Sequence, residues 1–408
     1  MLALIVLTLI AILIAPFFLQ LYAPTFTGRE ADLALIFTWF CLPQIIFYGL
    51  YAVLGQIANS RSIFGPMMWT PILNNLVVIA LFTSFLLLHD DVSLATITDA
   101  QVRLLGAGTT LGIIIQALAL IPTIRRLRIG LRLDFNFRES GLGKSIRLAG
   151  WTFLYALITQ LGFAVTVNLG TRITKEASLL GLDSGLGFTP YQNAYLIFLL
   201  PHSIFAISIA TALLPDLTRS VQENDLHSVR EKLIRSLRLC GIALIPSSLF
   251  FLIFGKKISE VIFFGIPTSD AQFIGSALSA FSLALVPLGL NMIFTRALNA
   301  FENTKYQALS NLIINSIASL LAILAYLFLP IESKTIGMAG SFTISYFIGA
   351  FITYLLLKRY LHHLPHRRYL ALYGQLTAIS LIPLLPLAII VAAFSETFFR
   401  MFQRTRRQ

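Results

Sequence analysis

The sequence predicts an all-α membrane protein, a polytopic helical bundle of about eleven transmembrane helices. Hydrophobic residues make up 57% of its 408 residues and charged residues only 12%, and the mean hydropathy is +0.82. Eleven runs that lack Lys, Arg, Asp and Glu are long enough, or nearly so, to cross a hydrocarbon layer about 30 Å thick. One water-soluble core cannot bury so much apolar surface, so bilayer lipid is the expected solvent.

Ten of the eleven runs are followed directly by a charged residue, and the third is followed by His89 and then Asp90; a charge stays outside the hydrocarbon because it is costly at the bilayer centre. The first run lacks the positive start and the small-residue cleavage site of a signal peptide, so we expect it to be a span. The seventh run is the shortest. In order, the runs cover residues 1–28, 33–60, 62–88, 104–124, 148–171, 184–215, 239–255, 271–295, 306–331, 335–357 and 369–395.

The second and eighth runs share a spacing. Pro43 is followed sixteen residues later by Asn59, and Pro287 is followed at the same interval by Asn303. The two runs are six apart in the series, which is the trace that a duplicated six-helix bundle would leave. We therefore predict two pseudo-repeated bundles of the same orientation, the first of them incomplete, plus an extra C-terminal helix. In folds of this kind the substrate binds between the repeats.

The predicted domains follow from this repeat, and two further helices of the first bundle are expected before Met1. The linker between the bundles alternates basic residues with Leu, Ile and Phe, so we expect it to lie along the membrane surface. After the last run, which contains Pro383 and Pro386, either the basic tail leads towards a further span, which we favour, or the run turns back as a hairpin. The domains are a partial N-terminal bundle of four spans (1–124), a basic amphipathic cytoplasmic linker (125–147), a C-terminal bundle of six spans (148–358), and an extra span with a basic tail (359–408).

Lys and Arg are distributed unevenly between the loops. If the N-terminus is cytoplasmic, the cytoplasmic loops hold eighteen of them and the outer loops seven, so the positive-inside rule predicts this orientation. The four arginines of the tail, from Arg400 to Arg407, are the exception. The net charge of +12 then indicates loops that face anionic membrane lipids, and it does not require a nucleic acid as partner.

Three segments resemble a known family. One runs from Leu42 to Asn75 and includes Gly55, Asn59 and Pro71; the others run from Leu200 to Arg219 and from Thr295 to Lys305. They are similar to the fourth and fifth, the eighth, and the tenth helices of the MurJ (MviN) family, the lipid II flippases of bacterial cell-wall synthesis. By this resemblance the eleven spans correspond to family helices three to thirteen. The arginine usual in the eighth helix aligns with Leu196.

The resemblance implies a V-shaped pair of bundles that opens alternately to each side of the bacterial cell membrane. Such a protein carries lipid II, an undecaprenyl-pyrophosphate-linked disaccharide pentapeptide, to the outer leaflet. It keeps a cationic cavity for the pyrophosphate and a groove for the lipid tail beside its extra C-terminal helices, and the membrane potential is thought to drive it. Cell-wall synthesis proteins are further expected partners.

Five residues are candidates for substrate binding. Arg296 matches a family position near the cytoplasmic end of the eighth span, where it either meets the diphosphate or is an ordinary interfacial arginine. His202 follows Pro201 in mid-span, and a hydrogen bond to a neighbouring helix is its alternative role. Gln160, Asn168 and Arg172 are spaced along one face of the fifth span, although Arg172 also suits the outer interface. Asn311 and Asn315, like Asn74 and Asn75, are expected to hold helices together.

Other classes of function are less favoured. A membrane enzyme that processes polyprenyl phosphates needs paired acids, and the acids of this chain are few and scattered, with Asp90 and Asp91 as one isolated pair. Another polysaccharide or O-unit flippase, or a drug exporter, of the same superfamily remains the closer alternative. His362, His363 and His366 lie among basic residues without Cys or acids, so nothing calls for a metal or another cofactor.

Overall fold

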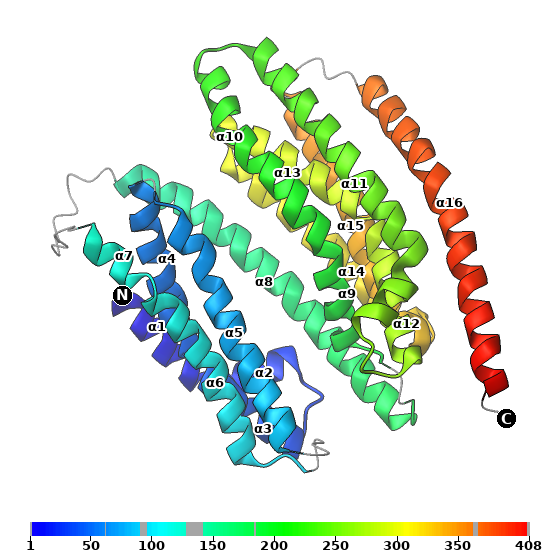
Figure 1. Cartoon of the computed structure of the whole chain (residues 1–408). Helices are drawn as coiled ribbons and strands as arrows, with labels where there is room; N and C mark the ends of the chain where they lie inside the picture. The colour runs from blue at the N-terminus through cyan, green and yellow to red at the C-terminus, as the bar shows by residue number, and fades with distance from the viewer. Residues whose placement is uncertain are drawn as a thin grey trace. The chain divides into compact units, whose positions relative to one another are not determined.

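The computed structural model describes residues 2–61, 63–89, 96–127, 142–182, 185–361 and 366–405. Every regular element in these ranges is a helix, as the all-α prediction required (Figure 1). By internal contacts the chain divides into two compact units, residues 1–137 and 138–408. The precise domain boundaries of the sequence analysis remain predictions.

In the first unit, α6 packs against α3, α4 and α5. The helices α1 and α2 are bent by 67° relative to each other, and a proline occupies the first turn of α2, where its missing N–H costs no helical hydrogen bond. The helices of the unit are α1 (Leu2–Leu13), α2 (Ala15–Tyr22), α3 (Arg29–Cys41), α4 (Gln44–Ser60), α5 (Gly65–Leu88), α6 (Asp99–Leu118) and α7 (Ile121–Arg126).

In the second unit, α11 and α15 are central: α11 packs against α10, α12, α13 and α16, and α15 packs against α8, α12, α13 and α14. A core of aromatic rings from α9, α12 and α15 fills the space between these helices. The helices of the unit are α8 (Leu142–Leu179), α9 (Phe188–Pro201), the π-helix η1 (His202–Ala206), α10 (Ile207–Gln222), α11 (Leu226–Ile262), α12 (Thr268–Ser282), α13 (Leu285–Ala300), α14 (Thr304–Phe328), α15 (Ile331–Lys358) and α16 (His366–Thr405).

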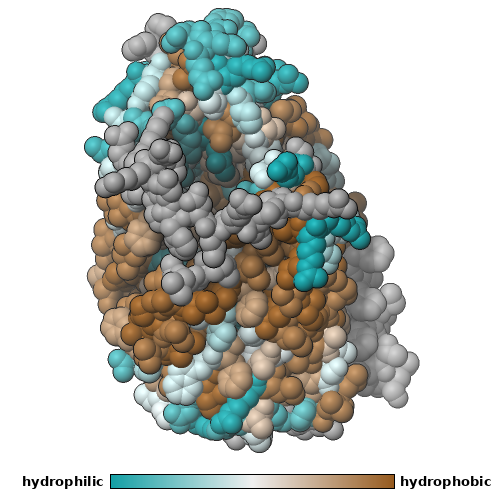
Figure 2. Space-filling view, turned by 90° about the vertical axis from the view of Figure 1, so that its left-hand side faces the viewer, coloured by the Kyte–Doolittle hydropathy of each residue, from teal (hydrophilic) through white to brown (hydrophobic). Residues whose placement is uncertain are grey.

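Nine helical segments of the described chain are long and apolar enough to cross a membrane, and two bent pairs, α1 with α2 and α12 with α13, raise the number to as many as eleven. The predicted membrane bundle is therefore confirmed. Many large apolar side chains are exposed on the surface, which is favourable in lipid and unfavourable in water. Leu87, for example, is 80% and Phe264 89% exposed. Hydrophobic residues cover much of the middle of the face in Figure 2, and hydrophilic residues gather towards its ends.

The packing within each unit follows the predicted repeat. In the first unit α4 follows a break at Leu42 and Pro43, and in the second α13 follows a break at Leu283 and Ala284, close to Pro287. The helix pair α3 and α4 packs against α6, and the pair α12 and α13 packs in the same way against α15. Likewise α5 packs against α6, as α14 does against α15. The four spans of the first unit thus make the same neighbour contacts as the seventh to tenth spans.

The sixth span is not a regular helix. Pro201 ends α9, and the next five residues form the π-helix η1 before α10 begins. A proline cannot donate the backbone hydrogen bond of a regular turn, and the wide turn η1 follows it directly, with the N–H of Ile207 bonded to the oxygen of His202. The turn η1 packs against α11 and α13.

The last helix, α16, lies along α11 (Figure 1). It continues through Pro383 and Pro386 without a break, so the hairpin alternative for this run was wrong. Tyr373 holds its first half in place, because the tyrosine hydroxyl donates a 2.8 Å hydrogen bond to the backbone oxygen of Leu237. The ring of Tyr373 lies over Gly241, where an added Cβ would stand 2.5 Å from a ring carbon.

An ion pair joins two helices at the end of the unit where α15 begins. Lys334 of α15 donates hydrogen bonds of 2.8 and 3.0 Å to the carboxylate of Glu176 on α8. The ammonium group also lies 4.5 Å from the centre of the Tyr326 ring on α14. This cation–π contact and the carboxylate together compensate the burial of the lysine.

Several sequence predictions concern residues outside the described ranges. They include most of the amphipathic linker, from residue 128 to 141, the acidic pair Asp90 and Asp91, and two members of the histidine cluster, His362 and His363. The last arginines of the tail also lie outside them.

Candidate functional site

Arg296 lines a small polar cavity inside the second unit. The cavity, here the Arg296 hollow, has a volume of about 240 Å³ and lies between α8, α13 and α14. The Nε of Arg296 and the Oδ1 of Asn299 are buried there without a hydrogen-bond partner among the described residues. A buried guanidinium nitrogen without a partner is costly, so the site suits a ligand that supplies an acceptor. The hollow is lined by Trp151, Thr152, Tyr155, Arg296, Asn299, Thr304 and Gln307.

A second polar cavity adjoins the first, because Tyr155 lines both. This amide hollow has a volume of about 150 Å³, and its lining includes Gln192, Asn311 and Asn315. Asn311 of α14 donates hydrogen bonds of 3.0 Å to the backbone oxygen of Tyr155 and 2.9 Å to the Thr159 hydroxyl, both on α8. The prediction that Asn311 joins two helices is therefore confirmed.

The Oε1 of Gln192 remains buried without a partner in the part of the chain that is described. Together the two cavities make a polar track along α8 that carries one positive charge, from Arg296. Such a track offers hydrogen-bond donors and a cation to a ligand, with no acid in its lining.

The three candidates on α8 lie on a different face from this track. Gln160 and Arg172 are exposed, and Asn168 is half-buried. The Nε of Arg172 donates a 2.8 Å hydrogen bond to the Oδ1 of Asn168, so these two side chains act together. On α8 the amide hollow is lined instead by residues such as Thr159 and Thr166, which sequence periodicity alone did not single out.

His202 is the first residue of η1 and is 7% exposed. Its Nδ1 is buried and has no hydrogen-bond partner among the residues that the structure describes. The ring does not line either polar hollow. The five candidates are therefore not gathered around one cavity of the second unit: Arg296 lines the track, Asn168 and Arg172 pair beside it, and Gln160 and His202 lie apart.

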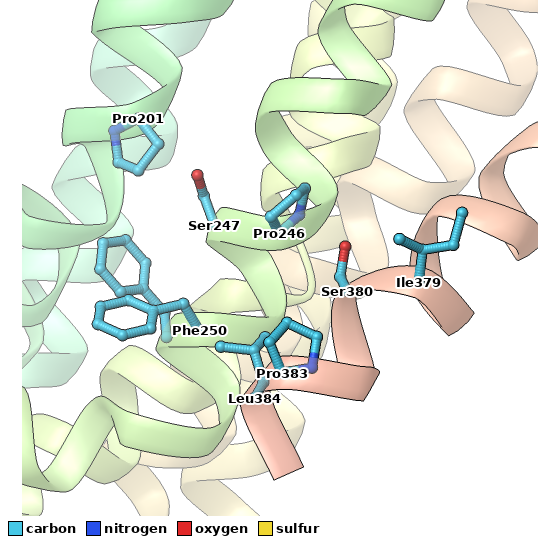
Figure 3. Close-up of a pocket in the computed structure, with 9 residues that line it drawn as sticks. Pro201, Pro246, Ser247, Phe250, Ile379, Ser380, Pro383 and Leu384 are labelled. Atoms are coloured by element: carbon cyan, nitrogen blue, oxygen red, sulfur yellow. The ribbon is translucent and has the colours of Figure 1, made fainter. Parts of the chain in front are cut away.

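An apolar groove of about 560 Å³ separates the middle of α16 from α11 and the end of α9. Figure 3 shows Pro246 of α11 lying towards Ser380 and Pro383 of α16, with Ser247 and Phe250 on the side of Pro201. Three prolines, two phenylalanines, an isoleucine and a leucine make up most of its walls, so the groove suits a hydrocarbon chain.

The sequence pointed to Arg296 and to the asparagines of α14, but it missed the rest of the site. Trp151 of α8 is distant in sequence from Asn299 and Gln307, which lie on the successive helices α13 and α14. Only the helix packing brings them together. A weak signal was present in Asn299, which lies three residues after Arg296 and therefore on nearly the same face of α13.

The fold and these cavities define a multi-pass, all-α membrane protein with a polar interior track and lipid-facing grooves. A family model for the Lipid II flippase MurJ matches residues 1–405, and the chain belongs to this family.

Among curated relatives, the chain is 25% identical over 349 residues to a probable lipid II flippase MurJ of Rickettsia prowazekii (strain Madrid E), an alignment that covers 83% of the chain and 63% of the relative. It is 22% identical over 354 residues to the corresponding protein of Treponema pallidum (strain Nichols), covering 86% of the chain and 62% of the relative. The chain thus spans somewhat less than two thirds of the length of these relatives.

Solved structures show the same fold. A lipid II flippase MurJ in an inward closed conformation superposes with a TM-score of 0.72 at 19% identity, over 98% of this chain and 81% of the other. An inward-facing multidrug resistance MATE family transporter of the MOP superfamily gives 0.65 at 13% identity, over 87% and 78%. At these identities the likeness concerns the fold alone.

Proposed function

We propose that the chain carries lipid II from the inner to the outer leaflet of the bacterial cell membrane by alternating access. The observation that carries the proposal is the Arg296 hollow, where a buried guanidinium nitrogen lacks an acceptor and hydroxyl and amide groups surround it. Membership of the Lipid II flippase MurJ family supports the same substrate.

The chemistry of a diphosphate explains why such a hollow is needed. A diphosphate carries several negative charges, and moving them into a low-dielectric interior is prohibitive without paired charge and hydrogen-bond donors. The planar fork of an arginine matches two phosphate oxygens at once, which a lysine cannot do. Arg296 supplies this fork, and Trp151, Gln307 and Thr304 supply further donors at the same cavity.

The hydrocarbon part of the substrate requires a separate path. The groove between α11 and α16 is apolar and opens beside the C-terminal helix, so it suits a polyprenyl tail (Figure 3). In this proposal the tail stays in the groove while the head group crosses. In the same proposal Asn168 and Arg172, with Gln160 on the same helix, form a second polar stripe for the substrate on another face of α8.

The orientation in the membrane belongs to the same proposal. An N-terminus in the cytoplasm leaves most Lys and Arg on the cytoplasmic side. A hydrogen bond of 2.6 Å from Asn303 to the hydroxyl of Tyr360 joins the turn before α14 to the turn after α15. This bond supports a position of Lys305 and Lys358, which lie close to these turns, on the same side of the membrane.

Binding of lipid II to the purified chain in nanodiscs tests the proposal. Arg296→Ala removes hydrogen bonds to a charged group, each worth about 1.5–3 kcal/mol, so the dissociation constant should rise roughly 10- to 100-fold. Arg296→Lys should recover only part of the loss, because it restores the charge without the fork. Lys305→Ala, an exposed basic residue at the same end of the unit, serves as the control and should leave binding unchanged.

Growth provides the second test. In a bacterium whose own flippase is depleted, the chain should restore growth, and Arg296→Ala should impair the rescue without lowering the amount of inserted protein. An inserted and stable chain that neither binds lipid II nor restores growth would contradict the proposal.

A drug exporter of the same superfamily is the second candidate, because a MATE transporter shares the fold. Cation-coupled export would need an acid in the transport path, and none lines either polar hollow in the described chain. The positive charge of Arg296 also repels cationic drugs. Binding of a cationic dye that Arg296→Ala leaves intact would favour this alternative.

A further inference from the structure

A fourth cavity of the second unit lies apart from the polar track. This cavity, here the α13–α15 groove, has a volume of about 590 Å³ and shares no lining residue with the Arg296 hollow, the amide hollow or the groove of Figure 3. Its walls are formed mainly by apolar residues of α13 and α15, and Leu237 of α11 and Tyr373 of α16 close one side. The function proposed above makes no use of it.

The groove has the length of one membrane leaflet. Along α15 its lining runs from Phe347 to Lys358, eleven residues apart, which corresponds to about 16 Å of helix. Half of the hydrocarbon layer is about 15 Å thick. On α13 the lining begins at Val286 and Pro287, next to the break in this span. The groove therefore extends from the end of α15 to about the bilayer midplane.

The outer wall of the groove is formed by side chains that face lipid. Phe347 and Phe351 are 54% and 61% exposed, whereas Ala350 between them is only 6% exposed and forms the floor. Two bulky rings one helical turn apart, with a small alanine beside them, line an apolar slot on this face of α15. A protein partner would cover such rings by a broad surface, whereas a single acyl chain fits the slot.

A positive charge marks the end of the groove at the membrane surface. Lys358 lines the groove, is exposed, and has no ion-pair partner in the described part of the chain. Arg359 follows it, and Arg238 lies next to Leu237 on α11. A hydrocarbon slot of one leaflet's length that ends at Lys358 is complementary to a lipid with a negatively charged head group.

The repeat provides an internal comparison. In the first unit a groove of about 660 Å³ lies beside Pro43, the counterpart of Pro287 in the repeat. It is lined by Trp39 and Phe40 of α3 and by residues 104–114 of α6, whereas the α13–α15 groove is lined by the last part of α15. The lining of the first groove contains no charged residue, so the two grooves share an apolar character but not their place in the repeat, and only the second has a cation at its end.

We propose that the α13–α15 groove binds one anionic phospholipid of the surrounding membrane, with an acyl chain in the slot and the phosphate at Lys358. The groove of the first unit, by contrast, takes up lipid without regard to its head group. The lipid at Lys358 is a bound partner that remains in place and is not the molecule transported.

Tryptophan fluorescence can report on the two grooves separately. In a protein with Trp39, Trp69 and Trp151 changed to Phe, Phe351→Trp places the single tryptophan in the charged groove. In a matched protein, Trp39 is kept as the single tryptophan of the uncharged groove. Both are placed in phosphatidylcholine nanodiscs, and brominated phosphatidylglycerol or brominated phosphatidylcholine is added as the quencher.

The expected result is a preference of about fivefold for brominated phosphatidylglycerol at Phe351→Trp, since one lysine near a membrane surface contributes about this factor. Lys358→Gln should abolish the preference, Lys305→Gln should leave it, and Trp39 should show none. Equal quenching by both lipids at Phe351→Trp, or a preference that survives Lys358→Gln, would overturn the proposal. Displacement of the brominated phosphatidylglycerol by a few per cent of a polyprenyl phosphate would assign the groove to the carrier lipid instead.

A measurement on the chain with its native tryptophans guards against poorly folded variants. Phosphatidylglycerol should raise the unfolding temperature of the unmodified chain more than phosphatidylcholine does, and Lys358→Gln should remove this difference. If both lipids stabilise the unmodified chain equally, the anionic site does not exist. Because neither measurement involves lipid II, failure of this proposal and failure of the proposed transport function remain distinguishable.

Discussion

Replacing Lys334 or Glu176 breaks the same ion pair, but we expect the two substitutions to lower the stability by different amounts. The lysine side chain is 11% exposed and the glutamate side chain 38% exposed. Glu176→Gln leaves the buried ammonium without its counter-charge, whereas Lys334→Met leaves a carboxylate that water can reach. The two substitutions break the same contact, so any difference in stability comes from the partner that remains.

The magnitude follows from the burial of each group. Removing one partner of a fully buried pair costs about 3–5 kcal/mol, and an exposed pair contributes about 0–1 kcal/mol. Because Glu176 is partly exposed, we expect Glu176→Gln to lower the free energy of unfolding by about 2 kcal/mol. Lys334→Met should cost about 1 kcal/mol or less, mostly the lost cation–π contact with Tyr326. The double variant should resemble Lys334→Met.

The assay uses a thiol that the chain already contains. Cys240 is 1% exposed in the second unit, and in a Cys41→Ala background it is the single cysteine. A maleimide dye that fluoresces on reaction with a thiol then reports when this unit opens on heating. A loss of about 2 kcal/mol corresponds to a decrease of roughly 4–8 °C in the midpoint.

Lys257→Met is the control for this assay, because Lys257 pairs with Glu260 within one helix and is 45% exposed. It should shift the midpoint little. If Lys334→Met is as destabilising as Glu176→Gln, or if Glu176→Gln leaves the midpoint unchanged, burial does not determine the cost of losing this pair.

Two further predictions concern helix contacts of the second unit. Gly241→Val should displace the first half of α16, because a Cβ at Gly241 would meet the ring of Tyr373. Gly340→Val is the control, since nothing lies within 4 Å of a Cβ there. The labelling rate of a cysteine placed on α16 should rise only in Gly241→Val, and equal rates in the two variants would contradict the expectation. Asn311→Leu should lower the free energy of unfolding by about 1–3 kcal/mol, because it removes the bonds to α8 and leaves the Thr159 hydroxyl without its donor, and a midpoint as high as that of the unmodified chain would refute this.

The spans were predictable because the hydrocarbon layer imposes their length and excludes charge. Their ends were less so. The seventh run, 239–255, is the middle of α11, which begins at Leu226 and ends at Ile262. Its first turns carry Arg230, Lys232 and Arg235, and Arg238 limits the apolar run without ending the helix. Hydropathy detects the part of a helix that lies in lipid, but it does not detect the solvated turns that continue the same helix.

The candidate site was harder to predict, for a geometric reason. Gln160 was chosen for its spacing to Asn168, but the neighbouring Thr159 lines the polar cavity. Adjacent residues differ by about 100° around a helix, and a span that is apolar on nearly all sides does not indicate which direction is inward. Lys334 directly precedes an apolar run, as an ordinary interfacial lysine would, and only the structure shows that it is buried and paired with Glu176.

The wide turn after Pro201 keeps one side of a long span facing inward. Ala194, Phe198, His202, Ala206 and Ala210 are all buried, each four residues after the last. In an uninterrupted α-helix, steps of four advance the direction by about 40° each time, so the row would wind away from its neighbours. The surplus residue of the π turn takes back about 100° of this drift. The number of residues in this stretch therefore matters more than their identity: a further inserted residue that no second wide turn absorbs would rotate everything beyond it by about 100°, whereas many substitutions would leave the alignment of the two halves intact.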